Sequence, residues 1–265
     1  MSRQKTLADG EQYVAKANEL IRNTRYSLTA QQQKIILFAI SKIKPDDDIS
    51  TEYTININEL ANACGINLRG GGYYYTDLKK DIDYLTQRDW CHMPDGLHMT
   101  MSWIGDAKIY DNDAVIKIRF NPNMQPYLFD LKRQYTLYQL QKVLVFRGKY
   151  TIRLYEIIRS FISKKDLDNG TFEDDEKTLS IEELRNLFDL GEKYKRWVDI
   201  KRYVLDPAID EINKYCDEFC IKECKGQSGS HTKKITSVYF YFTRAHCGQQ
   251  LTARQKEKQL NGLPY

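Results

Sequence analysis

The sequence has no run of apolar residues that approaches the ~20 needed to span a bilayer as a helix. Its N-terminal segment, MSRQKTLADGEQ, carries basic side chains with no apolar stretch behind them, so nothing in it resembles a secretion signal. Both absences argue against a membrane or secreted protein. We therefore expect a cytoplasmic protein.

Signatures of phosphate and nuclease chemistry are also missing. The glycine run at 70–72 lacks the G-x-x-x-x-G-K-[ST] spacing of a triphosphate site, so we interpret it as a flexible turn. A nickase with a tyrosine nucleophile needs two histidines around one apolar residue to hold a metal. No such triplet exists among His92, His98, His231 and His246. Nothing in the sequence would activate any of the 19 tyrosines, and we expect neither enzymatic activity nor a cofactor.

Six cysteines in 265 residues argue against a disulfide framework, and we expect them to be reduced. Several possible zinc ligands lie near the C-terminus: Cys216, Cys220, Cys224, His231, His246 and Cys247. We expect Cys216 at the end of a helix and Cys220 and Cys224 on a strand. Because this placement does not suit a zinc knuckle, we favour the absence of a metal site.

The composition describes a globular protein with more than one domain. Hydrophobic residues make up 42% of the chain and charged residues 29%. A chain of 265 residues favours two domains of about 100 to 150 residues each. The net charge of +4 permits a nucleic-acid partner without requiring one.

A winged-helix order is predicted in the first half. Thr29 and Gln32 form a capping-box pattern before a dense apolar stretch, which predicts a core helix over 29–44. Alternating residues predict a strand at 53–57, a short helix follows from Asn58 to near Gly65, and apolar spacing predicts a second helix over 73–88. Strands are expected within 90–103 and over 114–120. Two helices joined by a glycine-containing turn and followed by a hairpin are typical of a winged helix.

The same order recurs in the second half. INELAN (57–62) corresponds to IEELRN (181–186), and each follows a strand-like stretch and a long apolar helix, the second of these at 150–163. Each also precedes an amphipathic helix and a strand pair that ends in IKIRF (116–120) or VYFYF (238–242). We therefore predict an α+β protein with two tandem winged-helix domains.

The predicted boundaries place the N-terminal winged helix at 11–120, a connector at 121–148, the C-terminal winged helix at 149–247 and a polar tail at 248–265. The connector is expected to hold two short helices, starting at Pro122 and near Thr136. The acidic stretch 166–176 has little to bury, so we interpret it as a mobile surface loop.

The segment 193–203, KYKRWVDIKRY, is the most informative part of the chain. On a helical wheel, Trp197, Val198 and Ile200 fall on the broad apolar face that the rest of this helix shares. The polar face carries Arg196, Asp199, Arg202, Tyr203, Asp206 and Asp210. Its basic residues lie at the N-terminal end and its carboxylates towards the C-terminal end, so such a helix would meet DNA with its N-terminus.

These residue types suit contacts with base edges and phosphates. In a helix-turn-helix the first turns of the second helix enter the major groove. There an arginine donates two hydrogen bonds to guanine, and an aspartate accepts one from cytosine. Lys193, Lys195 and Lys201 would contact phosphates. An ordinary solvated charged face remains the alternative interpretation, and Pro207 is expected to remove one hydrogen bond and kink the helix beyond this end.

The equivalent helix of the first half is neutral in charge. Lys79, Lys80 and Arg88 oppose Asp77, Asp81 and Asp83. We expect phosphate or partner contacts there, with Lys79 and Lys80 as the phosphate contacts, rather than base recognition.

Five motifs in order resemble the plasmid replication initiators of the iteron-binding Rep family, over about Tyr13 to Phe242. They are VAKANELI near the N-terminus, YSLTAQQQKIILFAISKI (26–43), KYTIRLYEII (149–158), SIEELRNLFDL (180–190) and YKRWVDIKRYVLDPAIDEIN (194–213). The resemblance implies two winged helices that bind direct repeats at a plasmid origin in a bacterial cytoplasm. The sequence departs from the family in its glycine run at 70–72 and its cysteine-rich strand.

The resemblance also implies roles for single residues. Arg196, Asp199 and Arg202 match the family's base-contacting positions, and the second wing would lie near His231, Lys233 and Lys234, beside phosphates. Lys149 and Tyr203 complete the expected phosphate contacts. The implied partners are double-stranded origin DNA, a second copy bound through the N-terminal domain in equilibrium with the monomer, and the host helicase and initiator. The function implied is origin binding and opening, with repression of its own promoter by the dimer. A winged-helix transcriptional repressor is the alternative, and an origin-nicking endonuclease is disfavoured.

Overall fold

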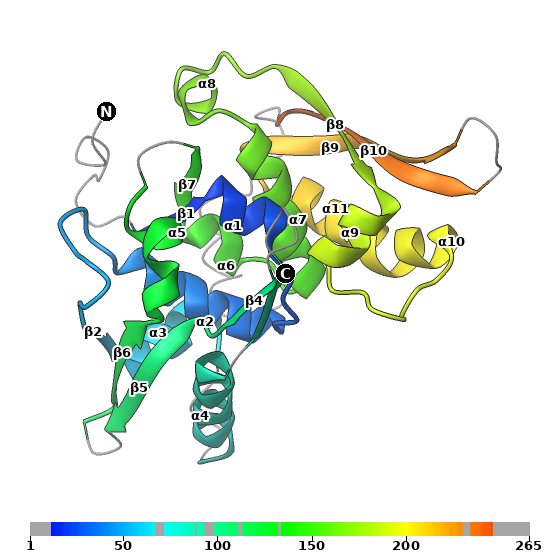
Figure 1. The fold of residues 1–265 in the computed structure, drawn as a ribbon. Coiled ribbons are helices and arrows are strands. Elements are labelled where there is room, and N and C mark those ends of the chain that lie inside the picture. Colours follow the sequence, from blue (N-terminus) through cyan, green and yellow to red (C-terminus); the bar gives the residue numbers. More distant parts are fainter. Residues whose placement is uncertain are drawn as a thin grey trace.

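A computed structural model describes residues 12–66, 72–87, 89–92, 98–110, 113–131, 134–229 and 234–245 (Figure 1). The elements in chain order are β1 (Tyr13–Ala17), α1 (Asn18–Asn23), α2 (Ala30–Ser41), β2 (Tyr53–Asn56), α3 (Ile57–Cys64), α4 (Gly72–Thr86), β3 (Asp89–His92), β4 (His98–Met101), β5 (Ile104–Tyr110), β6 (Val115–Phe120), η3 (Pro122–Met124), α5 (Gln125–Leu128), β7 (Tyr135–Gln139), α6 (Gln141–Leu144), α7 (Lys149–Phe161), α8 (Lys164–Asp168), β8 (Asp174–Ser180), α9 (Ile181–Leu187), α10 (Trp197–Ile200), η4 (Lys201–Leu205), α11 (Asp206–Tyr215), β9 (Phe219–Ser228) and β10 (Ile235–Arg244). None of the described helices is long and apolar enough to cross a membrane.

Helices α2, α3 and α4, with the sheet that follows them, form a winged helix in the N-terminal half. The predicted capping box is present, because the Thr29 hydroxyl accepts from the Gln32 backbone and the Gln32 side chain accepts from the Thr29 backbone. α3 begins at Asn56, whose side chain accepts from the first turn, and ends at Gly65 in the left-handed conformation (φ 70°) that favours glycine. Strands β2, β6 and β5 form an antiparallel sheet with β6 in the middle.

The C-terminal half repeats this order with α7, α9 and the continuous helical segment α10–η4–α11. α9 begins at a second capping box, formed by Ser180 and Glu183. Its sheet has the strand order β8-β10-β9, which is the same arrangement as β2-β6-β5. The structure therefore confirms the predicted α+β class with two tandem winged helices, and it confirms that 57–62 and 181–186 begin equivalent helices.

Helix α7 lies at the centre of the molecule between the two halves (Figure 1). Every side chain from Thr151 to Ser160 is buried. The helix packs against α1 and α2 of the N-terminal half and against α11 of the C-terminal half. Because the buried apolar residues of both halves form one continuous core, the two winged helices are held together by packing as well as by the chain.

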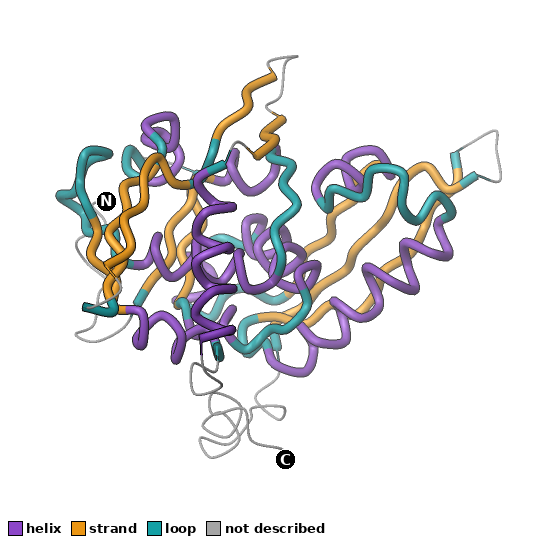
Figure 2. The backbone as a smooth tube through the Cα atoms, turned by 90° about the horizontal axis from the view of Figure 1, so that it is seen from below, coloured by secondary structure: helices purple, strands orange, loops and turns teal. Residues whose placement is uncertain are grey.

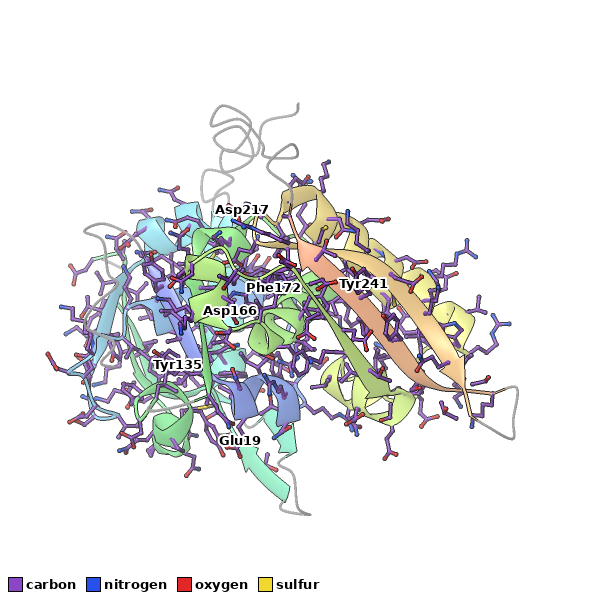
Figure 3. All side chains as sticks on the ribbon, turned by 90° about the horizontal axis from the view of Figure 1, so that it is seen from above. Glu19, Tyr135, Asp166, Phe172, Asp217 and Tyr241 are labelled. Carbon is purple, nitrogen blue, oxygen red and sulfur yellow. The ribbon has the colours of Figure 1, made fainter. Side chains whose placement is uncertain are left out.

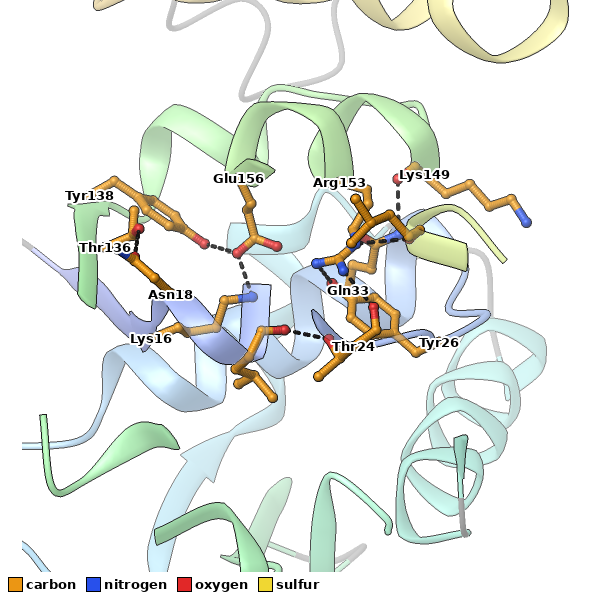
Figure 4. Close-up of polar contacts among 12 residues, drawn as sticks. Lys16, Asn18, Thr24, Tyr26, Gln33, Thr136, Tyr138, Lys149, Arg153 and Glu156 are labelled. Carbon is orange, nitrogen blue, oxygen red and sulfur yellow. Dashed lines mark hydrogen bonds and ion pairs between the residues drawn. The ribbon is translucent and has the colours of Figure 1, made fainter. Parts of the chain in front are cut away.

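A buried arginine on α7 bonds to both halves (Figure 4). The Arg153 guanidinium donates to the Leu187 carbonyl on α9 at 3.1 Å. It also donates to the Tyr26 hydroxyl at 3.1 Å and to the Thr24 carbonyl at 2.7 Å, both in the loop before α2. The guanidinium lies 4.6 Å from the centre of the Tyr26 ring. One side chain thus holds α7, α9 and the segment before α2 in a fixed relation.

A second polar contact of α7 is a buried ion pair with strand β1 of the N-terminal half. Glu156 accepts hydrogen bonds from the Lys16 ammonium of β1 and from the Tyr138 hydroxyl of β7. Lys16 and Glu156 are 2% and 1% exposed, so both charges are removed from water. Burial lowers the pKa of Lys16, although attraction to Glu156 opposes this change.

The helix predicted near Thr136 is wrong, because this segment is strand β7. It pairs antiparallel with β1 over five residue pairs, from Tyr13 with Gln139 to Ala17 with Tyr135. The short helix that follows is α6, whereas the helix predicted at Pro122 is present as η3 and α5. The pairing of β7 depends on a partner far away in the sequence, so local patterns could not indicate it.

The acidic stretch 166–176 is not the predicted mobile loop. It contains most of α8 and the start of β8. Tyr239 and Tyr241 of β10 donate hydrogen bonds to Glu176 and Asp174 at 2.9 and 2.8 Å. Phe172 is buried against Phe242, and Asp166, Phe172 and Tyr241 lie close together at this end of the sheet (Figure 3). Tyrosine hydroxyls on the neighbouring strand therefore let an acidic segment join a sheet.

The strands around the first wing also differ from the prediction. The range 90–103 contains the separate hairpin β3–β4, whereas the wing itself is formed by β5 and β6. β5 was not predicted as a strand. Its residues, IGDAKIY, alternate only weakly between apolar and polar types, and its pairing with β6 shifts register between Ile104 and Asp106.

Candidate nucleic-acid interface

The loop that leads into α10 is held by one arginine of α9. Arg185 donates to the carbonyls of Tyr194 and Lys193 at 2.8 and 2.9 Å, and also to the carbonyl of Gly191. Gly191 and Tyr194 both have positive φ, 49° and 52°. Three hydrogen bonds to carbonyls thus fix the turn between the two helices. The helical periodicity of the sequence does not indicate this role. In the sequence, Arg185 is noticeable only as one residue of the repeated motif IEELRN.

The helix begins at Trp197, later than the expected segment 193–203. Arg196 is its N-cap residue, with extended backbone. The left-handed Tyr194 and the hydrogen bonds from Arg185 prevent Lys193 to Lys195 from being helical. Lys193 and Lys195 therefore lie in the turn in front of the helix, where both are exposed.

Two of the three predicted base-contacting residues bond to each other. Arg196 donates from Nε and from one terminal nitrogen to the two carboxylate oxygens of Asp199, at 2.8 Å each. The Arg196 side chain is 78% exposed and that of Asp199 is 23% exposed. These hydrogen bonds lower the pKa of Asp199 and raise the pKa of Arg196, so both groups stay charged near neutral pH.

Arg202 is the third member of this group and is also exposed. Its guanidinium lies 5.3 Å from the centre of the Tyr203 ring. That ring in turn stacks on Tyr194 of the turn, with centroids 5.7 Å apart and planes at 25°. The stack connects the exposed face of the helix to the turn before it, which limits the motion of both.

A lysine of α7 also lies near this turn. Lys149 lies at the N-terminus of α7, with its ammonium 4.8 Å from the centre of the Tyr150 ring. Partial burial lowers the pKa of Lys149, and repulsion from Lys193 adds to this effect. The fold therefore gathers two predicted phosphate contacts that are 44 positions apart in the sequence.

The start of α10 also packs against the second wing. The β9–β10 hairpin runs alongside the α10–η4–α11 segment (Figure 2). At Gly226 on β9, an added Cβ would lie 2.8 and 2.9 Å from two atoms of the Trp197 indole. The indole thus lies directly on the strand backbone, and only glycine leaves room for it. This contact fixes the helix relative to the wing.

Pro207 lies where the helix changes its geometry. Residues 201–205 form a π-helical turn, and Pro207 stands in the first turn of α11, a position at which proline is tolerated. Lys201 forms an ion pair with Asp206 across this turn. The helix thus continues through the proline by widening before it.

Val198 does not lie on the apolar face, and this expectation is wrong. Its side chain is 64% exposed. Within α10, at about 100° per residue, Val198 lies about 160° around the helix from the buried Ile200.

In the N-terminal half, α4 is the equivalent helix. Asp81 accepts hydrogen bonds from Gln31 and Gln32 of α2 at 2.5 and 2.9 Å, which attaches α4 to α2. Lys80 is 69% exposed and pairs with Asp77 at 3.2 Å. Among the described residues of α4, lysines thus stand beside carboxylates, as the neutral charge of this segment indicated.

Several expected features lie outside the described residues. His231 and Lys233 of the second wing, Arg88, and the first part of the glycine run are among them. Lys234 is described and is exposed beside β10.

No group of three possible metal ligands gathers in the part of the chain that the structure describes. Cys216 follows α11 and the other two cysteines lie on β9, as expected from the sequence. Burial raises the pKa of Cys216 and of Cys224 to about 12, so both thiols stay protonated near neutral pH.

Two winged helices in tandem, the second with arginines and lysines at the start of α10, define a DNA-binding protein of the winged-helix class. A family described as "Initiator Replication protein, WH1" matches residues 13–159, and one described as "Initiator Rep protein, WH2" matches residues 180–242. The chain therefore belongs to this family of DNA-binding plasmid replication initiators, as its sequence motifs predicted.

Two proteins of Escherichia coli and one solved structure are similar to this chain. A "Replication initiation protein" of Escherichia coli is 25% identical over 221 residues, which cover 82% of this chain and 67% of the relative. An "Uncharacterized 27.6 kDa protein" of Escherichia coli is 30% identical over 113 residues, 42% of this chain and 43% of that protein. The crystal structure of the Pi initiator protein in complex with iteron DNA has a similar fold, with a TM-score of 0.69 over 89% of this chain and 99% of that one, at 18% identity.

Proposed function

We propose that this initiator binds direct repeats at a plasmid origin and recognises their sequence with the N-terminal end of α10. The observation that carries the proposal is the group of Arg196, Asp199 and Arg202 at the start of the helical segment, directly after the turn that Arg185 holds in place. A similar fold bound to iteron DNA supports the same interpretation.

Each residue of this group has a distinct task in the proposal. Arg196 uses Nε and one terminal nitrogen to bond Asp199, which leaves the edge formed by its two terminal nitrogens to donate to guanine O6 and N7. Asp199 holds this guanidinium and accepts from a cytosine amino group. Arg202, about one turn later, donates to a second guanine.

The lysines position the protein without selecting a sequence. Lys193, Lys195, Lys149 and Lys201 neutralise phosphates beside the major groove. Tyr203, Lys233 and Lys234 extend this contact to the helix face and the wing, while Lys79 and Lys80 contact the neighbouring turn of the duplex. Because these contacts displace condensed counterions, binding should weaken steeply with salt.

Further steps follow from the same assignment. The N-terminal domain, at 11–120, makes the secondary DNA contact in the monomer and forms the interface in a dimer. The C-terminal domain, at 149–247, carries the specificity, and 121–148 connects the two. The bound monomers open the origin and recruit the host helicase and initiator, whereas the dimer represses the initiator's own promoter. The proposed protein acts without catalysis in the bacterial cytoplasm.

The experiment compares one arginine with one lysine. A duplex repeat enriched from random DNA is titrated with the wild type, Arg202→Ala and Lys193→Ala at several salt concentrations. Arg202→Ala should cost about 1 to 3 kcal/mol on the enriched repeat and relax specificity at one base pair. Lys193→Ala should weaken binding to all sequences about equally and reduce the salt slope by about 1. If Arg202→Ala bound enriched and scrambled duplexes as the wild type does, the assignment of this helix would be wrong.

Two assays separate the alternatives. Supplying the protein in trans to a plasmid that carries only the origin should support its replication, which a simple repressor would not do. A nickase would cleave one strand in magnesium or manganese and stay covalently attached to it. The proposal predicts intact DNA in that assay.

A further inference from the structure

One aliphatic side chain of the recognition helix is exposed without a structural reason. Among the described residues, four large apolar or aromatic side chains are exposed, and three of them are tyrosines that carry a hydroxyl: Tyr84, Tyr110 and Tyr203. The fourth is Val198, which is the most exposed of the four at 64%. It belongs neither to the buried core nor to the partly buried side chains that pack against it.

The fold gains little from valine at this position. β-Branched residues are less favourable in helices than alanine, because the preceding turn restricts their side-chain rotation. An exposed valine also leaves its methyl groups in water. Neither packing nor helix propensity therefore explains why valine occupies this position. The reason must lie in what surrounds its side chain on the surface.

Those surroundings are the proposed base-contacting group. Val198 lies in the first turn of α10, directly before Asp199 and one turn before Arg202. The side chains of Val198 and Arg202 are both exposed, about one helical turn apart along the same segment. A base pair that meets Asp199 or Arg202 in the major groove would bring its neighbour against the valine methyl groups.

The major groove offers one apolar group, the 5-methyl group of thymine, and small apolar side chains contact it. A valine flanked by charged residues cannot hydrogen-bond to a base edge, but it can remove this methyl group from water. On the basis of the DNA recognition proposed above, we propose that Val198 is a specificity-determining residue that selects thymine, through its methyl group, beside the base pairs bound by Asp199 and Arg202.

The test removes the 5-methyl group of thymine and the methyl groups of Val198, first one at a time and then both together. The probe is the duplex repeat that the full chain enriches from random DNA, with each thymine replaced in turn by deoxyuridine, which lacks only the 5-methyl group. The proteins are the wild type, Val198→Ala and Val198→Thr, which keeps one methyl group. Since Val198 is exposed, the variants should unfold at the same temperature as the wild type, which controls for folding.

For the wild type, replacement at one thymine should weaken binding about fourfold, the factor expected from about one methyl group that is no longer removed from water. Val198→Ala should weaken binding to the thymine duplex by a similar factor and should no longer respond to deoxyuridine at that position. Val198→Thr should keep part of the response. The two changes are then coupled rather than additive, which is the signature of a direct contact.

Two other results would overturn the inference. If the wild type responds to no thymine, or if the effects of Val198→Ala and deoxyuridine simply add, Val198 does not contact a methyl group. In both cases strong preference for the enriched over a scrambled duplex would leave the proposed function intact. If the wild type does not distinguish those two duplexes, the proposed function fails and the role of Val198 fails with it.

Discussion

Replacing Arg153 should loosen the connection between the two winged helices. The side chain is 3% exposed and donates three hydrogen bonds, one to α9 and two to the segment before α2. In Arg153→Ala the carbonyls of Thr24 and Leu187 lose a buried donor, at about 1 to 3 kcal/mol each. The variant no longer has to bury a charge, which offsets part of this loss. The net destabilisation should be about 2 to 4 kcal/mol, a large fraction of the stability of a typical domain.

Urea unfolding, followed by circular dichroism and by tryptophan fluorescence, measures this change. Arg147→Ala is the matched control, because Arg147 is exposed just before α7, and it should stay within about 0.5 kcal/mol of the wild type. Arg153→Lys keeps the charge but not the planar fork, so its loss should be intermediate. A loss for Arg153→Ala no larger than for the control would refute this account of the interface.

Two further variants test other contacts. Gly226→Ala places a Cβ 2.8 Å from the Trp197 indole, so the start of α10 must move. Titrations should show weaker binding to the enriched repeat and unchanged binding to scrambled DNA. If the ratio of the two affinities stays that of the wild type, this contact does not have the proposed role. Glu156→Gln leaves the buried Lys16 ammonium without its carboxylate, which should cost about 3 to 5 kcal/mol at pH 7. Because burial lowers the pKa of Lys16 in the folded state, the unfolded chain binds more protons, so stability rises with pH and this deficit should shrink towards pH 10 in urea titrations. If the stability difference between Glu156→Gln and the wild type does not change with pH, the Lys16 ammonium is not its cause.

Much of the fold could be predicted because its signals are local. The capping boxes at Thr29 and Ser180 and the apolar spacing of the long helices do not depend on distant partners. The pairing of β1 with β7 does depend on a distant partner, and so does the inclusion of the acidic residues of β8 in a sheet next to tyrosines. No pattern within a short window contains that information.

The residues of the candidate site could be predicted from the sequence, but their arrangement in space could not. The helical wheel assumes an ideal helix over the whole segment, whereas the chain enters α10 through a left-handed Tyr194 and leaves it through a π-helical turn. The predicted apolar face was drawn wide enough to include Val198, and the wheel gave no sign that Arg196 and Asp199 would bond to each other. Arg185, which holds the turn, acts through backbone carbonyls that no residue pattern encodes.

The central claim is that the start of the α10–η4–α11 segment recognises the sequence of a repeated DNA site. Selection of bound fragments from random duplex DNA, done in parallel with the wild type and with Arg202→Ala, tests it most directly. The wild type should enrich one short motif, and the variant should enrich the same motif with the preference lost at a single base pair. Enrichment of no motif by the wild type, or of an identical motif by both proteins, would contradict the claim.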